Sequence, residues 1–338
     1  MGKTLSKPSD VGAVVPVRAA GGDNEVPRDG LGRPRIWVPC EKCSGSGEVP
    51  SEKRAGKFNQ CPTCKRQGRV LRSYTRTTTF IDVIEDKSTL MAWKQRMVLV
   101  GVTMEPSLTK DVLTYNDVLL NSEDDEEVKQ AKDWLNRRAE VAADKAGASE
   151  KADKGTFKHG LSEIVDRGED LPADVAFEDV IDMESYRAAT RGLKIKHMEQ
   201  LVVLDEFRVG GTPDRISEWV GDRPLVAPDG HVFGPGEFII TDLKTGTIEY
   251  GRLKMAMQLA IYAHSELYYW ETGEREKLPN LSQKWGIIMN TRADTGDTDL
   301  FWADLTMGWE AVRIAREIRQ LRSAGKKALV YFENPLAA

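Results

Sequence analysis

One part of the chain combines strand-like runs with charged side chains at their ends. The run 201–209 leads to Asp214, and the apolar run 238–241 leads to Asp242 and Lys244. Alternate residues of an extended chain point to the same face of a sheet, so we expect Asp242 and Lys244 to project together. Carboxylates hold hard divalent cations, and a nearby ammonium can offset charge that develops on a phosphate. The pattern therefore predicts a sheet that carries a metal-dependent site for phosphodiester cleavage.

Four short segments lie in a fixed order between residues 154 and 270: Gly155-Thr156-x-x-His159, Pro213-Asp214, Asp242-x-Lys244 and Gln258-x-x-x-Tyr262. The second and third resemble the motif of the PD-(D/E)xK nuclease superfamily. The first and last are similar to motifs of its RecB-like branch, which also contains the CRISPR-adaptation nucleases and phage exonucleases. Four elements in the family's order form a more specific signal than any one of them alone.

The resemblance implies a fold and an activity for residues 73–338. The fold is an α/β restriction-endonuclease-like core, with a mixed central sheet flanked by helices. The activity is divalent-metal-dependent cleavage of DNA, and we expect an exonuclease. The expected process is DNA recombination, DNA repair or the processing of phage DNA. DNA is the implied partner, and a recombinase or another DNA-processing protein is a candidate partner.

The resemblance also implies roles for single residues. Lys244 would be the catalytic cation beside Asp214 and Asp242. A Mg²⁺ or Mn²⁺ ion would be held by both carboxylates, the imidazole of His159 and the main-chain carbonyl of Leu243. Gln258 and Tyr262 lie four residues apart and hence on one face of a helix. They would support the site or contact DNA.

All four cysteines lie in one short window, as Cys40-x-x-Cys43 and, seventeen residues later, Cys61-x-x-Cys64. This spacing is typical of four-thiolate zinc sites and predicts a structural zinc module over residues 36–72. The first pair resembles the Cys-x-x-Cys-x-Gly-x-Gly repeat of the DnaJ cysteine-rich region. The second pair departs from that repeat because Lys65-Arg66-Gln67 precedes its only glycine. The RecB-like iron–sulfur cluster needs cysteines after the nuclease core, so we expect no such cluster here.

Charge is distributed unevenly along the chain. Residues 1–79 hold 15 Lys/Arg against 7 Asp/Glu, a net of +8, so the other 259 residues carry −13 of the total of −5. A basic segment on an acidic body favours local binding of phosphate. We therefore predict a flexible basic segment at 1–35 and DNA contacts by Lys65, Arg66 and Arg76. The alternative is that the zinc module has only a structural role and stabilises a segment too short to fold alone.

Two other functions remain open. One is a non-catalytic nucleic-acid-binding subunit that retains the nuclease fold, and the intact Asp214, Asp242 and Lys244 disfavour it. The other is a zinc-dependent protein-interaction module of DnaJ type, which the incomplete second repeat disfavours. Both differ from the nuclease hypothesis in predicting no cleavage of DNA.

Composition places the chain among ordinary globular proteins. Of its 338 residues, 40% are hydrophobic and 30% are charged. No apolar run approaches the length of a membrane span, and the first residues lack a signal-peptide core, so we expect a cytoplasmic protein, in the host cell if a phage encodes it. Hydrophobic periodicity predicts further elements: helices at 88–100, 123–154, 252–270 and 307–323, a strand pair at 192–219, and strands at 237–242, 284–291 and 299–305.

Overall fold

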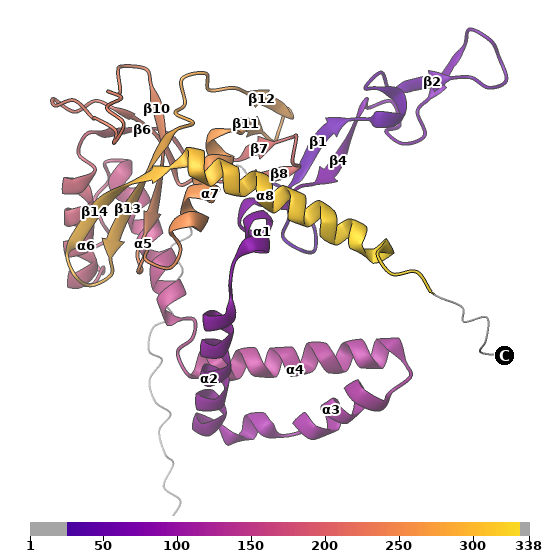
Figure 1. The fold of residues 1–338 in the computed structure, drawn as a ribbon, viewed down its shortest axis with the longest axis horizontal. Helices are drawn as coiled ribbons and strands as arrows, with labels where there is room; N and C mark the ends of the chain where they lie inside the picture. The colour runs from indigo at the N-terminus through magenta and orange to yellow at the C-terminus, as the bar shows by residue number, and fades with distance from the viewer. Residues whose placement is uncertain (1–25, 332–338) are drawn as a thin grey trace, which may run out of the picture.

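The computed structural model describes residues 26–331 and contains two five-stranded mixed sheets with helices around them (Figure 1). The prediction of an α/β fold with a four-cysteine cluster near the N-terminus is confirmed. Most of the predicted flexible segment 1–35 lies outside the described residues. No helix within residues 26–331 is long and apolar enough to cross a membrane.

The first sheet has the strand order β14-β13-β10-β9-β6. β10 and β13 are parallel, and the other neighbours are antiparallel. Its strands are β6 (Leu193–Met198), β9 (Arg215–Trp219), β10 (Phe238–Lys244), β13 (Trp285–Arg292) and β14 (Asp297–Asp304).

Strand β10 lies at the centre of this sheet and is buried on both faces. Ile239 and Leu243 pack in one hydrophobic cluster with Leu161 of helix α5. Ile240 points the other way and packs in a second cluster with Leu259 of helix α7. The sheet therefore has a helix layer on each face: α5 (Glu150–Asp166) and α6 (Phe177–Ala189) on one, α7 (Arg252–Ala263) and α8 (Leu305–Ala324) on the other.

The second sheet has the order β12-β11-β7-β8-β5. Its strands are β5 (Thr75–Arg76), β7 (Val202–Leu204), β8 (Val209–Gly211), β11 (Glu266–Tyr269) and β12 (Glu274–Glu276). β5 pairs in parallel with β8 and leads directly into the short helix α1 (Thr77–Ile81).

The cysteine region is a hairpin extension of the second sheet. Strands β1 (Arg35–Pro39) and β4 (Arg69–Ser73) pair antiparallel, and β2 (Glu48–Pro50) pairs with β3 (Phe58–Gln60) at the far end, which projects from the molecule (Figure 1). At the near end, Ile36 is fully buried in a cluster with Val203 and Tyr268. The predicted module 36–72 and the region that follows it thus share a hydrophobic cluster.

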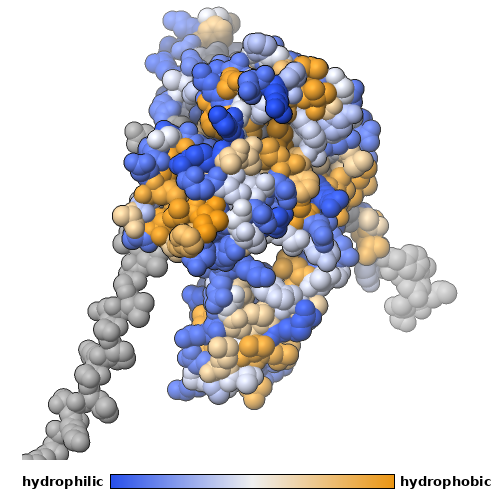
Figure 2. Space-filling view, turned by 90° about the vertical axis from the view of Figure 1, so that its left-hand side faces the viewer, coloured by the Kyte–Doolittle hydropathy of each residue, from blue (hydrophilic) through white to orange (hydrophobic). Residues whose placement is uncertain are grey.

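Three helices inserted between α1 and α5 form a separate lobe below the sheets (Figure 1). They are α2 (Ser88–Met104), α3 (Val112–Asn121) and α4 (Asp125–Lys145). Helices α2 and α4 cross at Gly101, where an added Cβ would lie 1.6 Å from the carbonyl oxygen of Ala142. Figure 2 shows hydrophobic residues on the surface of this lobe. Leu99 of α2 and Leu113 of α3 are exposed.

Three predicted elements differ from the structure. The predicted helix 123–154 is α4 and the first turn of α5, separated by a turn at 146–149 in which Gly147 takes a left-handed conformation (φ 81°). The predicted helix 252–270 ends at Ala263, because residues 266–269 instead form strand β11 and pair with β7. The predicted strand pair 192–219 is four strands shared between the two sheets. Glu199 (φ 49°) and Arg208 (φ 51°) take left-handed backbone conformations between these strands, which lets the chain turn where hydrophobic periodicity indicates continuous strands.

Candidate active site and cysteine centre

Strands β9 and β10 bring the two predicted carboxylates together. In their antiparallel register Thr241 lies opposite Arg215, so Asp242 is across from Asp214, the residue before β9. The main-chain N–H of Leu243 donates a hydrogen bond of 2.7 Å to Oδ2 of Asp214. The ammonium of Lys244 forms an ion pair with Oδ2 of Asp242. The three charged residues therefore meet at one end of the strand pair.

Helix α5 places His159 against this group. Nδ1 of His159 lies 3.4 Å from Oδ2 of Asp214. Burial lowers the pKa of His159; the charge of Asp214 opposes this shift, and the positive charges of Arg215 and Lys244 add to it. A neutral imidazole is the form that can coordinate a metal ion.

Helix α7 supports the same group from the other side. Nε2 of Gln258 lies 3.5 Å from Oδ1 of Asp242 and 3.2 Å from the hydroxyl of Tyr262. Burial, with the negative charge of Asp242, raises the pKa of Tyr262, so its hydroxyl stays protonated. Strand β8 can approach Tyr262 because Gly211 has no side chain: a Cβ there would lie 2.7 Å from the tyrosine ring.

The electrostatics of Asp242 fit a bound cation. The residue is 1% exposed, and the contact to its Oδ2 is the ammonium of Lys244. Burial raises the pKa of Asp242 to about 7, and the charge of Asp214 adds to the shift. Burial alone would lower the pKa of Lys244, but the negative charges of Asp242 and Asp214 outweigh burial and raise it. A divalent cation would relieve the repulsion between the carboxylates.

The ligand atoms of His159, Asp214 and Asp242 are nevertheless not gathered as closely as those of a closed metal site. Within residues 26–331, the sets of three or more His, Cys, Asp or Glu whose ligand atoms lie within 4.8 Å of one another are the four cysteines and an acidic triad. His159, Asp214 and Asp242 do not form such a set. Because the ammonium of Lys244 lies against Oδ2 of Asp242, a cation at that oxygen requires Lys244 to move aside.

The acidic triad Asp179, Asp182 and Asp294 already surrounds the ammonium group of Lys158. Lys158 is completely buried and pairs with Asp179 and Asp182. Asp182 also accepts hydrogen bonds of 2.7 Å from the main-chain N–H groups of Asp294 and Gly296. The network fastens α5, which carries His159, to α6 and to the turn between β13 and β14. We assign it a structural role.

Two further carboxylates lie near the site and were not predicted. Glu163 is 4% exposed, and burial raises its pKa, with a contribution from Asp214. Burial raises the pKa of Glu199 to about 8, and Asp214, Glu163 and Asp242 add to the shift. The position of Glu163, four residues after His159 on one helix face, was a usable sequence signal. Glu199 gave no such signal, because it is brought here by its left-handed turn and by a 3.1 Å bond from its N–H to the carbonyl of Asp214.

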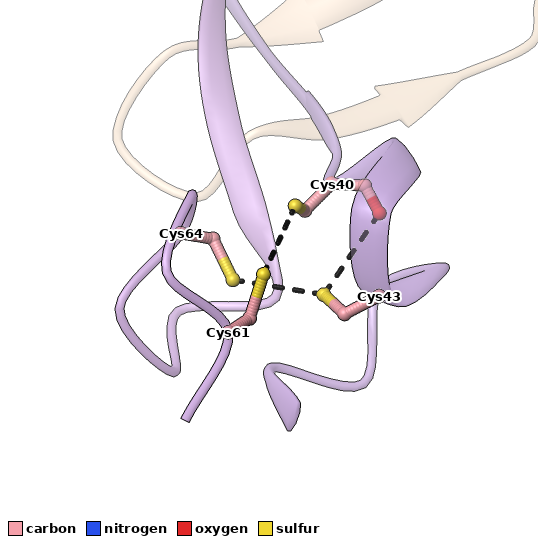
Figure 3. Close-up of side chains that lie close together, drawn as sticks. All are labelled: Cys40, Cys43, Cys61 and Cys64. Carbon is pink, nitrogen blue, oxygen red and sulfur yellow. Dashed lines mark hydrogen bonds between the residues drawn. The ribbon is translucent and has the colours of Figure 1, made fainter. Parts of the chain in front are cut away.

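The four cysteine thiols converge from two turns at the end of the hairpin (Figure 3). Cys40 immediately precedes the short 3₁₀ helix Glu41–Cys43, which ends with Cys43, and all four cysteines are buried. Sγ atoms of Cys40 and Cys61 are 3.7 Å apart, and those of Cys43 and Cys64 are 3.6 Å apart. A tetrahedral zinc ion with Zn–S bonds of ~2.3 Å needs sulfurs ~3.8 Å apart, so the separations fit zinc.

Main-chain amides stabilise the thiolate forms of Cys43 and Cys61, whereas burial raises the pKa of Cys64 to about 11. Hydrogen bonds from the amides of Cys64 and Thr63 help to lower the pKa of Cys61 to about 6, although burial opposes this shift. The N–H of Gly47 lies 3.2 Å from Sγ of Cys43. Since the thiolate is the zinc ligand, these donors favour metal binding. The buried four-cysteine group could therefore bind zinc.

At the departure from the DnaJ-like repeat, Arg66 keeps a left-handed backbone conformation. The two turns pack backbone against backbone: a Cβ on Gly68 would lie 2.3 Å from the carbonyl oxygen of Gly45, and one on Gly47 would lie 2.6 Å from that of Arg66. Arg66 takes φ 72°, close to the φ 85° of Gly45 at the equivalent position of the first pair. This left-handed conformation costs a non-glycine residue about 1–2 kcal/mol, which the surrounding turn tolerates.

The three predicted DNA-contacting cations are exposed. Lys65 and Arg66 are exposed in the cysteine region, where Nε of Arg66 is 3.7 Å from Glu48, and Arg76 is exposed on β5. Among the described residues, none of the three pairs with the carboxylates of the candidate active site. Their predicted role in binding DNA stays a prediction.

No family model matches the sequence, and no curated protein matches it. The function must therefore be argued from the geometry described above.

Proposed function

We propose that this protein is a divalent-metal-dependent DNA nuclease, with exonuclease activity, of the RecB-like branch of the PD-(D/E)xK superfamily. The proposal rests on one observation above all. Four motif segments that are far apart in the sequence meet at one end of β9 and β10, in side chains suited to binding a cation. The central mixed sheet between two helix layers is consistent with a restriction-endonuclease-like core.

The proposed metal ligands are the carboxylates of Asp214 and Asp242, the imidazole of His159 and the main-chain carbonyl of Leu243. A Mg²⁺ or Mn²⁺ ion bound there would supply an activated water and neutralise charge on the phosphate. Gln258 and Tyr262 hold Asp242 in position through the contacts described above.

Lys244 acts on the phosphodiester. Its raised pKa keeps the amine protonated, so the ammonium offsets charge on the non-bridging oxygens as water adds to phosphorus. The P–O bond to the leaving sugar oxygen breaks as the new P–O bond forms, which leaves one phosphate end and one hydroxyl end. The water's proton passes to solvent, and the leaving oxygen takes up a proton.

The cysteine centre is proposed to hold one structural zinc ion. Its role in the proposed nuclease is to fix the end of the β1–β4 hairpin, which otherwise has few apolar residues of its own. DNA binding by the basic residues around it is a separate hypothesis.

End-labelled linear DNA and closed circular DNA test this function directly. With Mg²⁺ or Mn²⁺ we expect the protein to release label from linear DNA and to leave the circle intact, and we expect no cleavage with EDTA. Cutting of the circle would identify an endonuclease instead. DNA binding without cleavage in either metal would contradict the proposal and favour the non-catalytic alternative.

A further inference from the structure

A large groove adjoins the candidate active site. It has a volume of about 830 Å³ and lies between the first turns of α5, the loop after β10 and the turn between β13 and β14. Thr245 and Gly246, which line it, directly follow Lys244. Gly155, also in its lining, lies one helical turn before His159. We call this cavity the α5–β14 groove.

The wall of the groove next to Lys244 is held in place by buried contacts. Asn290 is 3% exposed, and its Nδ2 donates hydrogen bonds of 2.9 Å to the carbonyl oxygens of both Lys244 and Gly246. Gly155 allows α5 to approach this loop closely, because a Cβ there would lie 3.0 Å from Oγ1 of Thr245. The position of the groove relative to Lys244 is therefore fixed by the fold.

Some charges in the groove are already neutralised. Lys154 forms an ion pair with Asp294. Arg292 forms ion pairs with Asp297 and Asp299. Lys154, Asp294 and Arg292 line the groove at the turn between β13 and β14, and their ion pairs leave it little net charge on that side.

Two other cations remain available. Lys151 and Arg252 are exposed in the groove, and neither has an ion-pair partner within residues 26–331. The remaining carboxylate of the lining is Glu249. Lys151 lies two turns before His159 on the same face of α5, a rise of ~12 Å. Positive charge at this distance from the site suits phosphates that flank the one being cleaved.

The groove also contains an apolar platform. Phe301 of β14 is 40% exposed and lines it together with Ile248. Both residues, with Arg252, also line an adjoining cavity of about 360 Å³, to which Leu253 contributes a partly exposed side chain. Aromatic side chains next to cations bind unpaired bases by stacking, whereas a duplex keeps the faces of its bases buried.

We propose that the α5–β14 groove holds a single DNA strand beside the active site, with backbone phosphates on Lys151 and Arg252 and a base on Phe301. This inference rests on the proposed function, because the strand is part of the nuclease substrate. The substrate then reaches Lys244 as a single strand, so duplex DNA must be unpaired at the groove.

Binding of labelled oligothymidylate and of a duplex of equal length, measured by fluorescence anisotropy at several salt concentrations, tests the groove. All proteins carry Lys244→Ala to prevent cleavage. Replacing both Lys151 and Arg252 by Ala should weaken single-strand binding about tenfold or more and reduce the salt slope by about 1.4. Phe301→Leu, which keeps an apolar side chain, should weaken it about fivefold or more with the slope unchanged. Lys132→Ala, on the exposed face of α4, is the matched control.

The outcomes separate this inference from the proposed function. The inference is overturned if the groove variants keep the wild-type affinity for single-stranded DNA and its salt dependence, even if wild-type protein cleaves DNA. Equal losses for the duplex would also overturn it, since the groove would then hold paired DNA. Selective loss of single-strand binding supports it. If that loss occurs but wild-type protein cleaves no DNA with Mg²⁺ or Mn²⁺, the proposed function fails and the groove assignment stands.

Discussion

Lys244→Ala is expected to lower the rate of DNA cleavage by at least about 10²–10³-fold, the usual effect of losing one group that stabilises transition-state charge. The loss should fall on the chemical step, because the ammonium acts on the phosphate as charge develops there. Single-turnover cleavage rates measure it, and anisotropy with the same DNA should show binding close to that of wild type.

The matched control for this variant is Lys132→Ala, because Lys132 is an exposed lysine on α4, in the separate helical lobe. We expect it to cleave at the wild-type rate. If Lys244→Ala also cleaves at that rate, Lys244 is not the catalytic cation and the assignment of the site is wrong.

Cys61→Ser is expected to remove zinc and to unfold the far end of the β1–β4 hairpin. Wild-type protein should contain about one zinc per chain and no iron. Zinc binding by a four-thiolate site contributes on the order of 10 kcal/mol to local folding, so its loss should lower the thermal unfolding midpoint. Elemental analysis and calorimetry measure both effects.

Thr63→Ala is the control for the cysteine centre, because Thr63 is exposed between Cys61 and Cys64 and the variant keeps both thiols and the amide. It should retain zinc and the wild-type midpoint. Wild-type protein that carries stoichiometric iron and absorbs visible light would overturn the zinc assignment.

The local part of the candidate site could be predicted from sequence, because it follows from the geometry of a strand. Alternation along β10 predicted that Asp242 and Lys244 share a face, and they form an ion pair. The approach of His159 to Asp214 is different, because 54 residues separate them and the contact depends on how α5 packs against the sheet. Only the family resemblance suggested that contact.

Other features depended on long-range packing that no local pattern encodes. Residues 266–269 continue a helical pattern, but pairing with β7 and burial of Tyr268 make them a strand. The cysteine spacing predicted the four-thiol group, yet it could not predict that the hydroxyl of Tyr268 would accept a 2.9 Å hydrogen bond from the N–H of Trp37. Glu199 reaches the site through a left-handed turn that sequence does not indicate for glutamate.

The central claim is that Asp214 and Asp242 hold a divalent cation, and Mn²⁺ binding measured by electron paramagnetic resonance tests it most directly. Asp242→Asn keeps the shape of the side chain but removes its negative charge. Asp229→Asn, at a carboxylate that pairs with Lys284 away from the site, is the control. We predict that zinc-loaded wild-type protein and Asp229→Asn bind Mn²⁺ equally and that Asp242→Asn binds it at least about tenfold more weakly. Equal Mn²⁺ affinity in wild type and Asp242→Asn would contradict the claim.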